Sequence, residues 1–423
     1  MSASYRYSTT VSTAEAGACL LAQAIDYRYN TRDWVVALNK LDRSSFDDFS
    51  GRPENLFGME LGYQNQGDFA GHMNADKRYS GNVAWLMWAI KDVKVNIPQW
   101  STETEQIGYV PEYDKAGRVT KVRFGMGINP YYLESDEFKL DSISYDPAGN
   151  FDKLKRRDET GDLMDDYTYN YYSGSHRLER IEDEEDYEGG QPDQNYRYDG
   201  NGNILRDKAA GIGFIFYDIF NRPIRYYSEN GQQFNCDYDH EGRRIKLFDG
   251  DQTRYYINDP KGRPLIIATS GSDNLILNLL GLENEGYLDY TSISQQRYYY
   301  LRDHVGSVRM ISDENGNAVA WTDYYPFGMP MPGRSGNPQG VDDRFKFTGK
   351  ACHERSRRKR DAMTGYDYSV ARYGAVPYFL VGNDFFTFLG FKNTNVVILT
   401  FRGALNFQSS IVSVTLSLCY FTR

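Results

Sequence analysis

One short motif recurs along this chain and constrains its fold more than any other feature: Tyr-Asp-x-x-Gly, followed by Arg or Asn. Four full copies occur, starting at Tyr113, Tyr145, Tyr198 and Tyr238. Looser copies lie at residues 29–34, 217–222, 259–262 and 313–316. Where copies are dense their spacing is roughly 20 residues, the length of two strands and two connections. The chain is therefore expected to be a repeat protein.

The chemistry of the motif predicts a β-hairpin. The Asp side chain can accept a hydrogen bond from the backbone two residues on, and the Gly can adopt a left-handed conformation that most residues avoid. In the copy at residues 217–222, Asn221 replaces Gly and is the next best residue at that position. The Tyr ends one strand, and the returning strand starts after a loop of about three or four residues. Alternating stretches at residues 166–172 and 195–198 also favour strands.

Composition agrees with stacked hairpins that form one long antiparallel sheet. The chain has 36 Tyr and 39 Gly, and Tyr can bury its ring in a sheet while its hydroxyl stays solvated. A net charge of −10 and a pI near 5.2 disfavour a nucleic acid as partner, because phosphate binding needs a basic face. They do not exclude a basic protein. The four cysteines lie too far apart to suggest a zinc, redox or disulfide motif: Cys19, Cys236, Cys352 and Cys419.

Residues 298–373 carry motifs that are more specific than the repeat. They include Tyr299-Tyr300-Leu301-Arg302-Asp303-His304-Val305-Gly306-Ser307-Val308-Arg309, Asp323-Tyr324-Tyr325-Pro326-Phe327-Gly328, Arg344-Phe345-Lys346-Phe347-Thr348-Gly349-Lys350 and Arg360-Asp361-Ala362-Met363-Thr364-Gly365-Tyr366-Asp367-Tyr368. This segment resembles the Rhs repeat-associated core domain, and the upstream motifs resemble the YD-repeat array of the same family. The likeness covers residues 25–373.

The resemblance implies both a fold and a role. Family repeats form a sheet that spirals into a hollow cocoon, so we expect an all-β fold in which repeated antiparallel β-hairpins form part of a spiralling sheet. The cocoon typically encloses a C-terminal effector, often a toxin. The chain is then expected to be a structural shell fragment of a secreted or surface Rhs-type protein, and not an enzyme. The alternative is a carbohydrate- or cell-surface-binding module, whose exposed rings would be Trp34, Trp85, Trp88 and Trp321.

Two departures from the family pattern bear on catalysis. In many family members the shell cleaves its own chain at an Asp-Pro-type stretch. Here residues 351–359 look like a basic insertion, and the pattern is lost from Gly374 onward. Asp361 and Asp367 would have no matching scissile partner downstream, so we assign no catalytic residue and expect no self-cleavage.

Other motifs are better explained as structure than as sites. The loops that start at Asp199 and Asp313 resemble calcium loops but have Ala210 and Tyr324 where an EF-hand needs Glu, so both are predicted to be repeat turns. His353-Glu354 lacks the second zinc histidine, and no metal or cofactor site is assigned. His304 is expected to be a packed structural residue.

Charged runs are expected on the surface. The acidic run at residues 182–186 is predicted to be a solvated loop, and the basic cluster at residues 355–360 an exposed insertion. The predicted divisions are an N-terminal shell part (1–105), a YD-repeat array (106–270), a core domain (271–376) and an atypical hydrophobic tail (377–423).

The expected context is a larger parent protein. The N-terminus lacks a signal-peptide pattern, which favours an internal piece of a secreted or surface protein, and no apolar run predicts a transmembrane helix. The expected partners are a C-terminal toxin or effector segment, or neighbouring shell segments, with a glycan as the alternative. Open strand edges predict that the isolated chain associates.

Overall fold

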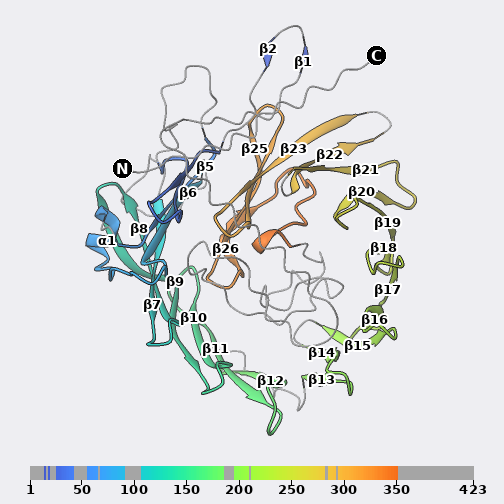
Figure 1. Ribbon diagram of the computed structural model, residues 1–423, viewed down its shortest axis with the longest axis horizontal. Helices are drawn as coiled ribbons and strands as arrows, with labels where there is room; N and C mark the ends of the chain where they lie inside the picture. The colour runs from blue at the N-terminus through green and yellow to red at the C-terminus, as the bar shows by residue number, and fades with distance from the viewer. Residues whose placement is uncertain are drawn as a thin grey trace.

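The structure is a computed structural model that describes residues 14–15, 18–19, 25–41, 55–64, 67–90, 106–184, 195–208, 211–281, 284–291 and 294–350 (Figure 1). These residues are almost entirely antiparallel β-structure, which confirms the predicted fold class. The strands follow one another around a curve (Figure 1), and within each sheet every strand pairs with its neighbour in the sequence.

The described strands form two long sheets and one short hairpin. The first sheet holds β3 (Tyr27–Tyr29), β4 (Val35–Leu38), β5 (Phe57–Gly62), β6 (Trp85–Ile90), β7 (Gln106–Tyr113), β8 (Val119–Ile128), β9 (Tyr131–Tyr145), β10 (Phe151–Arg157), β11 (Leu163–Tyr171) and β12 (Leu178–Asp183). The hairpin is β1 (Ala14–Glu15) with β2 (Ala18–Cys19).

The second sheet continues the same meander. It holds β13 (Tyr196–Tyr198), β14 (Ile204–Asp207), β15 (Ile212–Tyr217), β16 (Pro223–Ser228), β17 (Gln233–Tyr238), β18 (Arg244–Phe248), β19 (Thr253–Asn258), β20 (Pro264–Thr269), β21 (Leu275–Leu280), β22 (Asn284–Tyr290), β23 (Gln295–Arg302), β24 (Val308–Asp313), β25 (Ala318–Tyr324) and β26 (Pro330–Gly336). The 3₁₀ turn η1 (Phe347–Gly349) comes after β26.

A short helix, α1 (Asp68–His72), covers part of one face of the first sheet. Phe69 of α1 and the adjacent Met73 belong to a buried cluster with residues of that face. Gly108 and Gly125 are paired directly below, and a Cβ on Gly125 would come within 2.7 Å of the Met73 sulfur. The absence of side chains at these two positions therefore allows the close approach.

The repeat motif forms one kind of turn throughout the described residues. At Asp218 the carboxylate Oδ1 accepts the backbone N–H of Phe220 (2.9 Å) and of Arg222 (2.8 Å), while Arg222 Nε donates to Oδ2 (2.6 Å). Asn221 has a φ of 58°, as its replacement of Gly predicts. The same bond from the N–H four residues on recurs at Asp114, Asp146, Asp158, Asp199, Asp239, Asp259, Asp303 and Asp313.

This bonding confirms the predicted turns, including the looser copies and both loops that resemble calcium loops. In the copy at residues 29–34, Asn30 Oδ1 accepts the N–H of Trp34 (3.1 Å) and Asp33 has a φ of 59°. Burial opposes ionisation of Asp218, but the hydrogen bonds from Arg222 and Phe220 outweigh it and lower the pKa of that carboxyl. Each of these turns is therefore held by a side-chain oxygen, which is a carboxylate oxygen at the aspartates and an amide oxygen at Asn30.

The tyrosine of the motif links each turn to the one before it. Its hydroxyl donates to a backbone carbonyl at the start of the strand that follows the previous turn. Tyr145 donates in this way to Val119 (2.8 Å), and Tyr238 donates to Pro223 (2.9 Å). The arginine of the earlier turn stacks on the same ring, with the Arg118 guanidinium 4.6 Å from the Tyr145 centroid. Successive hairpins are thus tied in register by a hydrogen bond and a cation–π contact.

The two sheets meet between β12 and β13. Here the Tyr172 hydroxyl donates to the carbonyl of Tyr196 (2.8 Å), and the Tyr172 ring lies edge-on to Tyr198 at 6.2 Å. A tyrosine hydroxyl therefore also connects the end of the first sheet to the start of the second, although this bond runs forward along the chain and those between repeats run backward.

The prediction that residues 182–186 form a solvated loop is wrong for residues 182 and 183. Glu182 and Asp183 end strand β12. Asp183 is buried there, and its carboxylate accepts the backbone N–H of Asp166 (3.2 Å) on β11. A buried acceptor at a strand end needs such a donor. Glu185 and Asp186 lie outside the described residues.

The turn carboxylate can be tested with Asp218→Ala. The variant loses two backbone acceptor bonds and one arginine bond, so the free energy of unfolding should fall by about 1–3 kcal/mol in urea denaturation. Asp237→Ala is the matched control, because its exposed carboxylate on β17 makes one ion pair with Lys246, and it should change stability by less than about 1 kcal/mol. Equal effects of the two variants would contradict this account of the turn.

Candidate functional site: the junction between the two sheets

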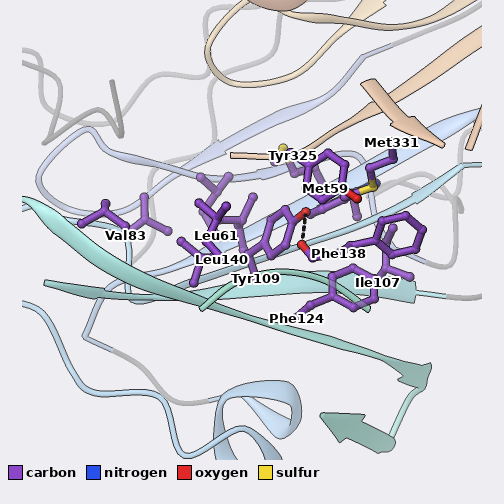
Figure 2. Close-up of a cluster of buried hydrophobic side chains, with 14 of the residues drawn as sticks. Met59, Leu61, Val83, Ile107, Tyr109, Phe124, Phe138, Leu140, Tyr325 and Met331 are labelled. Atoms are coloured by element: carbon purple, nitrogen blue, oxygen red, sulfur yellow. Dashed lines mark hydrogen bonds between the residues drawn. The ribbon is translucent and has the colours of Figure 1, made fainter. Parts of the chain in front are cut away.

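The last strands of the second sheet pack on the first strands of the first sheet. One buried cluster combines Leu301, Met310, Tyr325 and Met331 from the second sheet with side chains of β5 to β11. Figure 2 shows Tyr325 and Met331 beside the rings and aliphatic chains of the first sheet, with the Tyr109 hydroxyl bonded to the carbonyl of Phe138 at 3.2 Å. The curve of the described strands therefore closes where the last strands of the second sheet meet the first sheet.

At the centre of this junction lies the carboxylate of Asp323, which is fully buried. Its Oδ1 accepts hydrogen bonds from Arg309 Nη2 (2.5 Å) and from the indole Nε1 of Trp88 (2.7 Å). Its Oδ2 accepts from Arg334, with Nε at 2.8 Å. Two arginines from the second sheet and one tryptophan from the first thus converge on one acidic side chain.

Charge in this cluster is balanced. Arg309 also lies 3.4 Å from Asp303, so two carboxylates face two guanidinium groups, and the Arg309 guanidinium stacks 4.7 Å from the Trp88 ring. Burial by itself would lower the pKa of Arg309, but Asp323 and Asp303 outweigh it and the pKa is raised. The arginine therefore stays charged, and removing either carboxylate would leave a buried cation without compensation.

A second contact lies at the turn after β25. The Tyr325 hydroxyl donates to the carbonyl of Arg157 (2.9 Å), and its ring packs against Phe138 at 5.8 Å. The Arg156 guanidinium lies 5.2 Å from the same ring and is itself paired with Asp165. Burial raises the pKa of the Tyr325 hydroxyl, which keeps it a neutral donor.

The segment after β26 packs on the opposite face of the second sheet. Val341 and Phe345 join the cluster on that face, and the Phe345 ring lies 5.9 Å from Tyr300. The carbonyl of Lys346 accepts the N–H of Val308 (3.1 Å), and Ser307 Oγ accepts the N–H of Thr348 (3.1 Å). In Figure 1 this segment lies on the concave side of the curve.

The structure also shows where the candidate site residues from the sequence analysis lie. His304 sits inside a repeat turn, where burial lowers the pKa of its imidazole. Its structural role stays a prediction, as does the absence of catalytic, metal and cofactor residues. Among the described residues, no group of three or more His, Cys, Asp or Glu side chains is placed to hold a metal ion.

Other sequence predictions fall outside the described residues. These are the insertion at 351–359, the basic cluster at 355–360, His353, Asp361, Asp367, Gly374 and the tail at 377–423. The predicted domain boundaries also stay predictions. Cys236 is buried on β17.

Sequence reasoning missed the junction itself. Asp323 and Arg309 lie inside quoted motifs, but neither motif indicates that Trp88, 235 positions from Asp323, is a partner. The available signal was one Asp and two Arg within a short β-rich segment, since charges that become buried in such a segment must be paired.

Both the repeat and its closure define a β-sheet repeat shell. Comparison with protein families agrees: the teneurin YD-shell model matches residues 85–337. This is more than half of the chain, so the chain belongs to the teneurin YD-shell family, and the role of this part is structural.

Two curated relatives match smaller parts. The tRNA3(Ser)-specific nuclease WapA of Bacillus spizizenii is 25% identical over 43% of this chain, and the tRNA nuclease WapA of Bacillus subtilis (strain 168) is 24% identical over 43%. This chain covers 7% of the length of each.

Solved structures show a weaker likeness. The crystal structure of TcdB2-TccC3 without its hypervariable C-terminal region is 12% identical with a TM-score of 0.26, covering 77% of this chain and 23% of that chain. That of TcdB2-TccC3-TEV is also 12% identical, with a TM-score of 0.26 and coverage of 81% and 22%. In the described part of the chain, no helix is long and apolar enough to cross a membrane.

Asp323→Asn tests the junction. The neutral side chain leaves Arg334 buried without its carboxylate partner and Arg309 with Asp303 alone, so the free energy of unfolding should fall by about 3–5 kcal/mol. Glu314→Gln is the control, because Glu314 is partly exposed in a 3.6 Å pair with Arg297, and should change stability by less than about 1 kcal/mol. Similar urea midpoints for Asp323→Asn and the unmodified chain would refute the role of this carboxylate.

Proposed function

We propose that this chain is the shell part of a secreted or surface Rhs-type protein and that the shell encloses a C-terminal effector or toxin segment, which the chain after Lys350 leads into. Residues 271–376 would serve as the core domain of that protein. Membership in the YD-shell family supports the shell role. The enclosed effector and the location outside the cell are the further steps of the proposal.

One observation carries the enclosure. The last described segment, residues 337–350, is fixed to the concave face by Phe345 against Tyr300 and by the backbone bond from Val308 to Lys346. A chain fixed there at Lys350 continues from the concave side of the curve. Anchoring by both a partly buried ring and a backbone bond makes that exit point well defined.

The proposal gives Asp323 a structural and not a catalytic role. Its two oxygens already accept bonds from Trp88, Arg309 and Arg334, so neither is free to move a proton to a substrate. The carbohydrate-binding alternative needs exposed rings, but two of the four tryptophans proposed for it, Trp85 and Trp88, are buried. Trp34 packs on Tyr63 at 4.9 Å, and Trp321 packs against the junction cluster.

A protease-accessibility experiment tests enclosure. A short cassette with one site for a sequence-specific protease is added after Arg423, and the same cassette is added before Met1 in a second protein. If the shell encloses the segment after Lys350, the C-terminal cassette should be cut at least about tenfold more slowly than the N-terminal one. Asp323→Asn, which weakens the closure, should reduce that difference.

Equal cleavage rates for the two cassettes in the unmodified shell would contradict enclosure. Protection that persists unchanged in Asp323→Asn would also count against it, provided that the variant unfolds at lower urea. Protease fragments are separated by mass, so that cleavage elsewhere in the chain is not counted.

A further inference from the structure

An uncharged apolar strip crosses four strands of the second sheet on the face away from residues 337–350. Strand pairing aligns its members in two rows. The rows are Ile257, Ile266, Leu277 and Leu288, and Tyr255, Ala268, Leu275 and Tyr290. We call these eight residues the outer strip.

Four members of the outer strip are exposed and the other four are partly exposed, whereas the apolar residues at the centre of the opposite face are buried. Ile257 is 59% exposed, Tyr255 49%, Tyr290 47% and Leu275 40%. On the opposite face, Tyr256, Ile267, Ile276 and Tyr287 are buried in one cluster. A sheet that faces water on one side normally alternates apolar with polar residues, so two apolar faces indicate that something covers the second face.

Charge at the outer strip is unusually low for a chain with a net charge of −10. The charged residues of these strands, Arg254, Glu285 and Asp289, alternate onto the opposite face. The nearest cations on the strip side are already neutralised within the chain. Lys246, opposite Tyr255, pairs with Asp237 at 3.3 Å, and Arg297, opposite Leu288, pairs with Glu314 at 3.6 Å.

The outer strip continues an interface that the molecule already uses. Alternation from Arg297 places Leu301 on the same face, and Leu301 is paired with Met310. Both are buried against the first sheet in the junction cluster. This face of the second sheet therefore packs against another β-sheet at β23 and β24, and remains uncovered at β19 to β22.

We propose that the outer strip is the contact between two copies of this chain, strip against strip about a two-fold axis. A second copy presents a sheet surface with the same apolar rows and no charge of its own, so two such surfaces meet without repulsion. A two-fold contact requires one self-complementary patch, which the strip provides. Sheets stack face to face in this way in β-sandwiches.

Sedimentation velocity of the full chain over a range of concentrations tests the proposal. The unmodified chain should dimerise, and Ile257→Asp and Leu275→Asp should each weaken dimerisation by at least about tenfold, because each copy buries an aspartate in an apolar contact. Ile219→Asp is the matched control, since Ile219 is 89% exposed on a repeat turn outside the outer strip and its replacement should leave the dimer intact.

Circular dichroism and urea midpoints confirm that each variant is folded. A chain that stays monomeric at all concentrations would overturn the proposal. Association that is unchanged in both strip variants would also overturn it and would assign association to the open strand edges. If Ile219→Asp weakened dimerisation as much as the strip variants do, the cause would be the general exposure of apolar residues. That result would contradict a specific contact through the outer strip.

Discussion

Between one repeat turn and the next, a tyrosine hydroxyl donates to the carbonyl at the start of the previous returning strand, as Tyr145 does to Val119. The turn carboxylates fix each hairpin, but this bond fixes one hairpin relative to another. Where tyrosine is absent, another donor serves the same kind of carbonyl: Asn258 bonds to Arg244 at 3.0 Å, and Arg302 to Asn284 at 2.7 Å. The geometry of the contact, more than the identity of the residue, is what repeats.

Regular spacing of hairpins has a consequence for the whole curve. Neighbouring strands in a sheet rotate in one direction, so a long meander with a fixed hairpin-to-hairpin contact curves steadily. The same chain then brings β24 and β25 onto β5 and β6, where Asp323 meets Trp88. Local contacts thus lead to the long-range junction, and the buried ion cluster holds the two ends at one relative position.

Much of the local structure could be predicted from the sequence, because each turn depends on residues within five positions. Asn221 was correctly predicted as a left-handed substitute for Gly. The turns at Asp158 and Asp303 were not recognised, because arginine stands in front of them where the motif has tyrosine. The first half of the acidic run was misassigned, since the bond from Asp166 to Asp183 joins strands whose pairing the run itself does not indicate. The junction could not be predicted because no periodic pattern relates Trp88 to Asp323.

The most direct test of the account is a double-mutant cycle between Trp88 and Asp323. Trp88→Phe, Asp323→Asn and the double variant are compared in urea denaturation with the unmodified chain. If the two ends of the curve meet through the 2.7 Å bond between these side chains, the two effects should be non-additive by about 1 kcal/mol or more. Effects that add to within about 0.5 kcal/mol would show that the sheets do not meet there and would contradict the closed curve.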